Sequence, residues 1–339
     1  MSERLTKILG YVTLFAILAA IWVLFGEDPA RQQGGRGEKL FPGLAAQINT
    51  VTGLSLSGPG GQVSLNKDSD GWRVKERGGY RADTDKINAF LRGLAVGVRR
   101  DPKTDRPKSL PKIGLGDKAT FVTLTGADGA ELASLSLGTR RQAASGKSLT
   151  YVYRESDTRS WLVSHIAAFE STPAWWLDRS VLTLDSDQTV ALDLGPVAFV
   201  RAEAGAPMTL DDTKDGEEPG QAWKIQKAVS AVTRLAATDV RKTANPLSDP
   251  LRVITVQQAD GLRVRLTLFS LEGENWAMIT ASNNADGGGA PDKPDAVFEA
   301  EKINQQAAGW LYRLPSTDAQ TLLAPRAYFM ADSGLPAVK

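Results

Sequence analysis

The sequence contains one histidine and no cysteine among its 339 residues. Disulfide bonds, thiolate metal sites, cysteine nucleophiles and a zinc site built on several imidazoles are therefore excluded. His165 could act as a general base, but no serine or carboxylate partner can be tied to it from the sequence. We therefore expect an exposed or structural histidine, and no metal, cofactor or catalytic residues.

Two adjacent tryptophans, Trp175 and Trp176, are followed closely by Asp178 and Arg179. Aromatic side chains beside charged ones could line a groove for a sugar or a peptide. Core packing is the alternative, because a late tryptophan recurs as Trp310 in the second half of the chain. We expect Trp176 and Trp310 to be mainly structural, and we keep Trp175, Trp176, Asp178 and Arg179 as a candidate ligand or partner surface.

Two motif-like strings each lack a residue that their chemistry requires. Gly146-Lys147-Ser148 ends like a phosphate-binding loop, but Arg141 stands where the first glycine of that loop belongs. Residues 66–71 space oxygen ligands like a calcium loop, but Arg77 occupies the position of its final glutamate. Neither string therefore predicts a nucleotide or metal site.

Charge and composition exclude further classes. The chain carries 40 Lys and Arg against 39 Asp and Glu, a formal net charge of +1. A dedicated nucleic-acid binder would have an excess of basic residues, so no nucleic-acid partner is expected. With 42% hydrophobic and 23% charged residues, the chain is globular and long enough for two domains.

The N-terminal segment predicts a membrane anchor. Residues 8–25 form an uncharged apolar run, close to the ~20 residues that a helix needs to cross a bilayer. A cleaved signal peptide is the alternative, although its apolar region is shorter, ~7–15 residues. Because Glu27 and Asp28 follow the run, we expect residues 1–7 in the cytoplasm and the body in the periplasm. The protein would then be a single-pass protein of a bacterial inner membrane.

Residues 26–38 have the composition of a flexible tether, and an α+β pattern follows. Strand-like runs surround the turns at Asp70-Gly71 and at residues 127–129, and a third hairpin is expected over residues 150–163. The apolar spacing of residues 84–98 predicts a helix, and a short second helix is expected from about Ser164.

A similar order recurs in the second half of the chain. Trp223-Lys224-Ile225 resembles the strand Trp72-Arg73-Val74, and the turn at residues 259–261 repeats Ala-Asp-Gly. A final helix from Glu299 is expected to include Trp310. We therefore predict two related lobes, residues 39–185 and 186–339, each an antiparallel meander sheet with helices packed on one face.

Several short strings together resemble a known bacterial family. They are the Gly71-Trp72 pair, the step at Gly114-Leu115, the hairpin FVTLTGADGAELASLSLG, the pair YVYRES and WLVS, and the segment TPAWWLDRSVL. With the anchor and the LFPGL string at residues 40–44, they resemble the bacterial domain of unknown function numbered four-three-four-zero.

The resemblance implies a role but no catalytic residues. Proteins of this family look like membrane-anchored partners of ABC-type permeases related to gliding-motility transporters. The chain is therefore expected to be a non-enzymatic accessory or scaffold subunit, with permease subunits and the lipid bilayer as partners. Two alternatives stay open: a module that binds a glycan or peptide of the cell envelope, and an envelope hydrolase with paired carboxylates.

Overall fold

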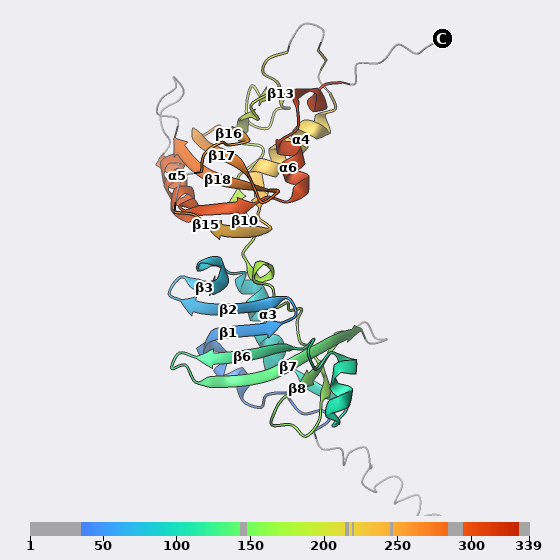
Figure 1. The fold of residues 1–339 in the computed structure, drawn as a ribbon. Coiled ribbons are helices and arrows are strands. Elements are labelled where there is room, and N and C mark those ends of the chain that lie inside the picture. The colour runs from blue at the N-terminus through green and yellow to red at the C-terminus, as the bar shows by residue number, and fades with distance from the viewer. Residues whose placement is uncertain are drawn as a thin grey trace, which may run out of the picture. The chain divides into compact units, whose positions relative to one another are not determined.

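The computed structural model describes residues 35–142, 148–213, 217–218, 220–244, 247–283 and 294–331. Within these residues the protein is an α+β protein built on antiparallel sheets (Figure 1). The anchor predicted over residues 8–25 and the first part of the tether lie outside the described residues. Among the helices that are described, none is both long and apolar enough to cross a membrane.

The described chain forms two compact units. Unit 1 comprises the residues up to 62 together with residues 85–171, and unit 2 comprises residues 63–84 and the residues from 172 onward. The lobe boundary expected between residues 185 and 186 stays a prediction.

Unit 1 contains six antiparallel strands in the order β1-β6-β7-β8-β9-β5. Their alternating burial shows the period of two that a sheet with one covered face requires. The predicted hairpins at residues 127–129 and 150–163 are present. The strands are β1 (Val51–Gly58), β5 (Val98–Pro102), β6 (Thr120–Gly126), β7 (Glu131–Gln142), β8 (Ser148–Tyr153) and β9 (Trp161–Ser164).

The main helix of unit 1 is α3 (Thr84–Val96). Ile87, Phe90, Leu91 and Leu94 recur at helical spacing and are all buried, so the predicted helix is confirmed, except that it ends at Val96 and Val98 begins β5. Shorter helical segments are α2 (Leu44–Gln47), η1 (Ile48–Thr50) and η3 (Pro107–Ile113).

The start of the described chain is bound to the edge of the unit 1 sheet. Residues 37–40 run alongside β5, where the amide of Arg99 donates to Glu38 and the amide of Leu40 donates to Gly97. The side chains behind this contact form a buried ion-pair network, because Asp157 accepts hydrogen bonds from both Arg99 and Arg154. Arg154 also donates to the Leu40 carbonyl at 2.7 Å, so the network fixes this segment to the unit.

Unit 2 contains an eight-stranded antiparallel sheet in the order β13-β12-β11-β16-β17-β18-β19-β15. A separate two-stranded sheet joins β10 to β14, and β4, β3 and β2 are consecutive antiparallel neighbours in one sheet. The strands are β2 (Gly61–Asp68, its first two residues in unit 1), β3 (Gly71–Val74), β4 (Tyr80–Arg81), β10 (Ser180–Thr183), β11 (Thr189–Asp193), β12 (Ala198–Val200), β13 (Thr209–Leu210), β14 (Arg234–Ala236), β15 (Asp239–Lys242), β16 (Arg252–Gln258), β17 (Leu262–Leu271), β18 (Glu274–Asn283) and β19 (Trp310–Arg313).

The helices of unit 2 are α4 (Ala222–Thr233), α5 (Pro294–Ala307) and α6 (Ser316–Leu322), with 3₁₀ turns η2 (Lys75–Arg77), η4 (Pro173–Trp176) and η5 (Arg326–Phe329). Helix α5 lies against β18. There the side-chain amide of Asn304 donates to the Ala281 carbonyl at 2.7 Å and accepts from the Ala281 amide at 2.8 Å.

Three expectations about the elements are wrong. Trp223-Lys224-Ile225, expected as a strand, lies in the first turn of helix α4. Its short alternation is overridden by the helical spacing of Ile225, Val229 and Val232. No helix follows Ser164, where His165 adopts a positive φ of 72°. Trp310 begins strand β19, because Gly309, with a φ of 75°, follows the end of α5.

The same strand order occurs in both units. The series β1-β6-β7-β8-β9-β5 matches β11-β16-β17-β18-β19-β15 position by position, and α3 and α4 each precede the last strand of their series. In this correspondence Trp161, which begins β9, matches Trp310, which begins β19.

Candidate functional site

The two adjacent tryptophans do not present a common surface. Trp176 is completely buried, whereas Trp175 is partly exposed. Their rings meet edge to face, with centroids 4.6 Å apart, in the 3₁₀ turn η4. This arrangement assigns Trp176 to the core.

The two charged residues that follow have different surroundings. Asp178 accepts a hydrogen bond of 2.8 Å from Arg81 and lines a surface hollow of about 370 Å³ with it. Arg179 is exposed, and its backbone carbonyl accepts from Ala237. The candidate surface of four residues is therefore not brought together as one site; Asp178 alone among them lines this hollow.

His165 has a polar neighbour that the sequence analysis did not identify. Its Nδ1 lies 2.9 Å from the hydroxyl of Ser164. That hydroxyl also lies within hydrogen-bond distance of Arg100 Nε and the Val98 carbonyl, and Ser164 is buried. A nucleophile must be accessible to a substrate, and the buried Ser164 is not. The contact between Ser164 and His165 therefore fits a structural role at the end of β9.

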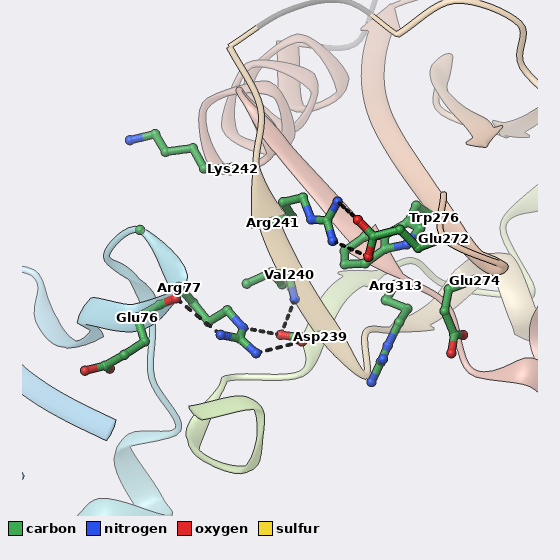
Figure 2. A pocket seen from close by; sticks show the side chains of 11 residues that line it. Glu76, Arg77, Asp239, Val240, Arg241, Lys242, Glu272, Glu274, Trp276 and Arg313 are labelled. Carbon is green, nitrogen blue, oxygen red and sulfur yellow. Dashed lines mark hydrogen bonds and ion pairs between the residues drawn. The ribbon is translucent and has the colours of Figure 1, made fainter. Parts of the chain in front are cut away.

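A hollow of about 440 Å³ in unit 2 collects more charged side chains than the other described hollows (Figure 2). We call it the charged hollow. It lies along strand β15 and the turn between β17 and β18, and η2 forms its other side. Its lining residues are Glu76, Arg77, Gly78, Asp239, Val240, Arg241, Lys242, Glu272, Glu274, Trp276 and Arg313.

The inner ion pair of the charged hollow joins η2 to β15. Arg77 Nε and Nη2 donate to the two oxygens of Asp239 at 2.6 and 2.9 Å, a bidentate arrangement. The same carboxylate accepts from the amide of Val240 at 2.9 Å. Both side chains are largely buried, so this pair is held more firmly than a surface ion pair.

The outer ion pair is exposed and stacked on an aromatic ring. Arg241 donates from both terminal nitrogens to Glu272 at 3.1 Å, and its guanidinium lies 5.0 Å from the ring centroid of Trp276. The hydrogen bonds from Arg241 lower the pKa of the Glu272 carboxyl. Glu272 can take this place because it and Gly273 both have positive φ values, 56° and 80°, in the tight turn between β17 and β18.

The remaining charged groups are Glu76, Lys242, Glu274 and Arg313. Arg313 donates through Nε to Thr238 at 2.9 Å, and Glu76 accepts from the amide of Ser64. Figure 2 shows Glu76 and Lys242 extending away from the outer ion pair. Four basic and four acidic side chains thus line the hollow, with no excess of either charge.

Chemically, this arrangement is suited to recognition. Balanced and partly exposed ion pairs around a tryptophan can exchange partners with the charged groups of a docking protein and fix its orientation. Within the described part of the chain, no group of three or more His, Cys, Asp or Glu is placed to hold a metal ion.

Comparison with protein families gives one match. The model of the family described as Domain of unknown function (DUF4340) matches residues 72–252, more than half of the chain. The chain belongs to this family. No curated protein and no solved structure matches the sequence. The resemblance found in the sequence is thereby confirmed, and the DUF4340 match includes η2 and the β15 side of the charged hollow.

The charged hollow could not be predicted from the sequence because its residues come from four separate segments. Only the turn Glu272-Gly273 gave a local signal, since a glycine between two strand-like runs marks a hairpin. The pairing of Arg77 with Asp239 spans 162 residues and follows from tertiary structure alone.

Proposed function

We propose that this DUF4340 protein is a membrane-anchored, periplasmic accessory subunit of an ABC-type transport complex, and that it works by binding. The uncharged run at residues 8–25 supports the anchor, and the accessory role is what the resemblance to membrane-anchored partners of ABC-type permeases implies. In the full architecture, the anchor precedes two lobes that arose from one repeated α+β unit. The shared strand order of the two sheets supports that repeat.

The charged hollow is the observation that carries the binding role. It combines a stacked tryptophan, a bidentate exposed ion pair and an equal number of acidic and basic groups. Complementary charges at an interface contribute mainly to orientation and to the rejection of wrong partners. The proposed partner is therefore a permease subunit that presents its own paired charges to β15 and to the β17–β18 turn.

Co-purification from detergent-solubilised membranes tests both parts of the proposal. The full chain carries an affinity tag after Lys339, and the permease and ATPase subunits are quantified by mass spectrometry. We expect both to co-purify with the unaltered chain. Arg241→Glu reverses one charge of the outer ion pair and should lower their recovery about tenfold.

Lys118→Glu is the matched control, because Lys118 is exposed and belongs to unit 1. It should leave recovery unchanged. If no transport subunit co-purifies with the unaltered chain, the accessory role is wrong. If Arg241→Glu and Lys118→Glu recover the transporter equally well, the role stands but the charged hollow is not its docking site.

The location is tested separately with reporters fused after Lys339. A periplasmic body should give an active alkaline phosphatase fusion and a dark cytoplasmic fluorescent fusion. The opposite pattern would place the body in the cytoplasm.

A further inference from the structure

A second hollow in unit 2 contains different chemistry. It has a volume of about 370 Å³ and is lined by the β2–β3 hairpin, by β4, by the end of α5 and by the first residue of β19. We call it the aromatic hollow. Its lining residues are Asp70, Arg73, Gly79, Tyr80, Arg81, Gln305, Gln306 and Trp310.

Two aromatic rings form one wall of the aromatic hollow. Trp310 is partly exposed, and its ring meets that of Tyr80 at an angle of 76° with centroids 4.9 Å apart. Lys242 Nζ, from the charged hollow, lies 5.7 Å from the Trp310 centroid. Tyr80 and Lys242 therefore both pack against Trp310.

The two arginines of the aromatic hollow are already paired with carboxylates. Arg73 donates to Asp68 at 3.0 Å and contacts Asp70 at 3.4 Å. Arg81 donates to Asp178 at 2.8 Å, and its guanidinium also lies 5.3 Å from the Tyr80 centroid. Their remaining N–H groups can donate hydrogen bonds, but the positive charge is balanced, so the site does not select for an anion.

Two side-chain amides complete the polar set. Gln305 and Gln306 are exposed at the end of α5, and each amide offers both donors and an acceptor. The hollow thus combines an aromatic wall with carboxylates that accept hydrogen bonds, guanidinium groups that donate them and amides that do both. A few convergent polar groups beside aromatic surface are typical of small-molecule sites, which measure about 300–1,000 Å³.

We propose that the aromatic hollow binds a neutral saccharide of one or two rings. A pyranose presents an apolar C–H face, which suits Trp310, and a rim of hydroxyls that both donate and accept hydrogen bonds. Asp70 can accept from those hydroxyls, Gln305 and Gln306 can both accept and donate, and Arg73 and Arg81 can donate. This ligand site goes beyond the accessory role, and it shares no lining residue with the charged hollow.

Calorimetric titration tests the proposal with the full chain in a detergent that has no sugar headgroup. The probes are glucose, galactose, N-acetylglucosamine and their β-linked dimers. We expect saturable binding of at least one probe. Trp310→Ala should weaken that binding about tenfold, the size of effect expected when one aromatic contact of about 1.4 kcal/mol is lost.

Two further variants separate loss of the site from loss of the fold. The double variant Gln305→Ala and Gln306→Ala changes only exposed side chains and should weaken binding with an unchanged melting temperature. Trp223→Ala removes a tryptophan that is 53% exposed and lies outside the aromatic hollow, so it should bind as the unaltered chain does.

The proposal is wrong if no probe saturates the unaltered chain, or if the glutamine variant and Trp310→Ala bind as tightly as it does. Saccharide binding and transporter recovery are independent readouts. Arg241→Glu should reduce recovery of the transporter and leave saccharide binding intact, so failure of either proposal can be recognised without the other.

Discussion

The amide of Asp83 donates a hydrogen bond of 2.7 Å to the carbonyl of Trp176. The bond joins the residue before α3 to the aromatic turn η4, and a second bond from the Asp178 amide to the Arg81 carbonyl extends it as an antiparallel pair. The buried Trp176 is therefore hydrogen-bonded to the residue that directly precedes α3.

The second half of unit 2 repeats this arrangement. Gly220, shortly before α4, donates to the carbonyl of Phe329, and Ala331 donates to the carbonyl of Glu218. Phe329 is completely buried in the turn η5, and its ring meets Tyr328 edge to face, as Trp176 meets Trp175. The structural counterpart of Trp176 is thus Phe329, not the Trp310 that the spacing along the sequence suggested.

We predict that Trp176→Ala and Phe329→Ala destabilise the protein to a similar extent. Each truncation opens a cavity at a completely buried aromatic position, which typically costs about 3–5 kcal/mol. Denaturant unfolding of the full chain measures the loss, and Trp175→Ala, at a partly exposed position, should cost less. Unchanged stability of Trp176→Ala, together with lost partner binding, would return Trp176 to the candidate binding surface.

Gly93→Ala should destabilise unit 1 even though alanine favours helices by about 1 kcal/mol over glycine. A Cβ at position 93 would lie 2.5 Å from the His165 carbonyl oxygen and 3.0 Å from the Ala167 nitrogen, both backbone atoms. Relief of that overlap requires a backbone shift, which costs about 1–3 kcal/mol. Asn88→Ala on the same helix is the control and should be neutral or mildly stabilising. A more stable Gly93→Ala variant would show that α3 packs less closely on residues 165–167.

Asp157→Asn should be among the most damaging single-atom changes in unit 1. The carboxylate is 8% exposed and is shared by Arg99 and Arg154, which are 10% and 17% exposed. Its loss removes the close counter-charge of two buried guanidinium groups, of which Arg99 keeps only the longer contact to Glu38 at 3.9 Å. Breaking a buried ion pair in this way costs about 3–5 kcal/mol. Thermal and denaturant unfolding should both show it.

The control for that experiment is Asp70→Asn, which breaks an ion pair whose carboxylate is 75% exposed. It should alter the free energy of unfolding by at most about 1 kcal/mol. Equal effects of the two substitutions would mean that the network around Asp157 is solvated.

Stability should depend on the titration of Asp318. Burial raises the pKa of this carboxyl above its ordinary value of 3.8, against the smaller lowering effects of Thr317 and Lys227. A raised pKa means that the folded state binds the proton more tightly than the unfolded state. The contribution to stability is therefore complete below pH 3.8 and is lost as the pH rises through the folded-state pKa.

Asp318→Asn mimics the protonated form and should raise the melting temperature at neutral pH, with the gain disappearing in acid. Asp295→Asn should give no such gain. Both aspartates lie in the first turn of a helix, but Asp295 is exposed whereas Asp318 is partly buried. A pH-independent effect of Asp318→Asn would contradict the role of burial.

Local signals were sufficient to predict much of the fold. Asp-Gly turns between alternating runs identified the hairpins at residues 70–71 and 127–129, and the spacing of Ile87, Phe90, Leu91 and Leu94 identified α3. The segment at Trp223 was misassigned because three alternating residues fit both the period of a strand and the period of a helix. Trp176 was matched to Trp310 on spacing along the chain, and that spacing misleads when the loops of the two halves differ in length.

Neither hollow could be predicted in the same way. The charged hollow depends on Arg77 reaching Asp239, and the aromatic hollow depends on Tyr80 meeting Trp310. Those contacts arise when β3 and β4 lie beside β19 and α5 within unit 2. No periodicity or turn chemistry specifies such a contact between distant segments.

The contact between Asn304 and Ala281 has a consequence for solubility. Strand β18 continues beyond its pairing with β19, which involves only Trp276 and Ala277. An unpaired strand edge invites hydrogen bonding from another chain and so promotes aggregation. The Asn304 amide imitates a peptide group and occupies both the N–H and the C=O of Ala281. A helix side chain thereby protects a sheet edge against intermolecular pairing.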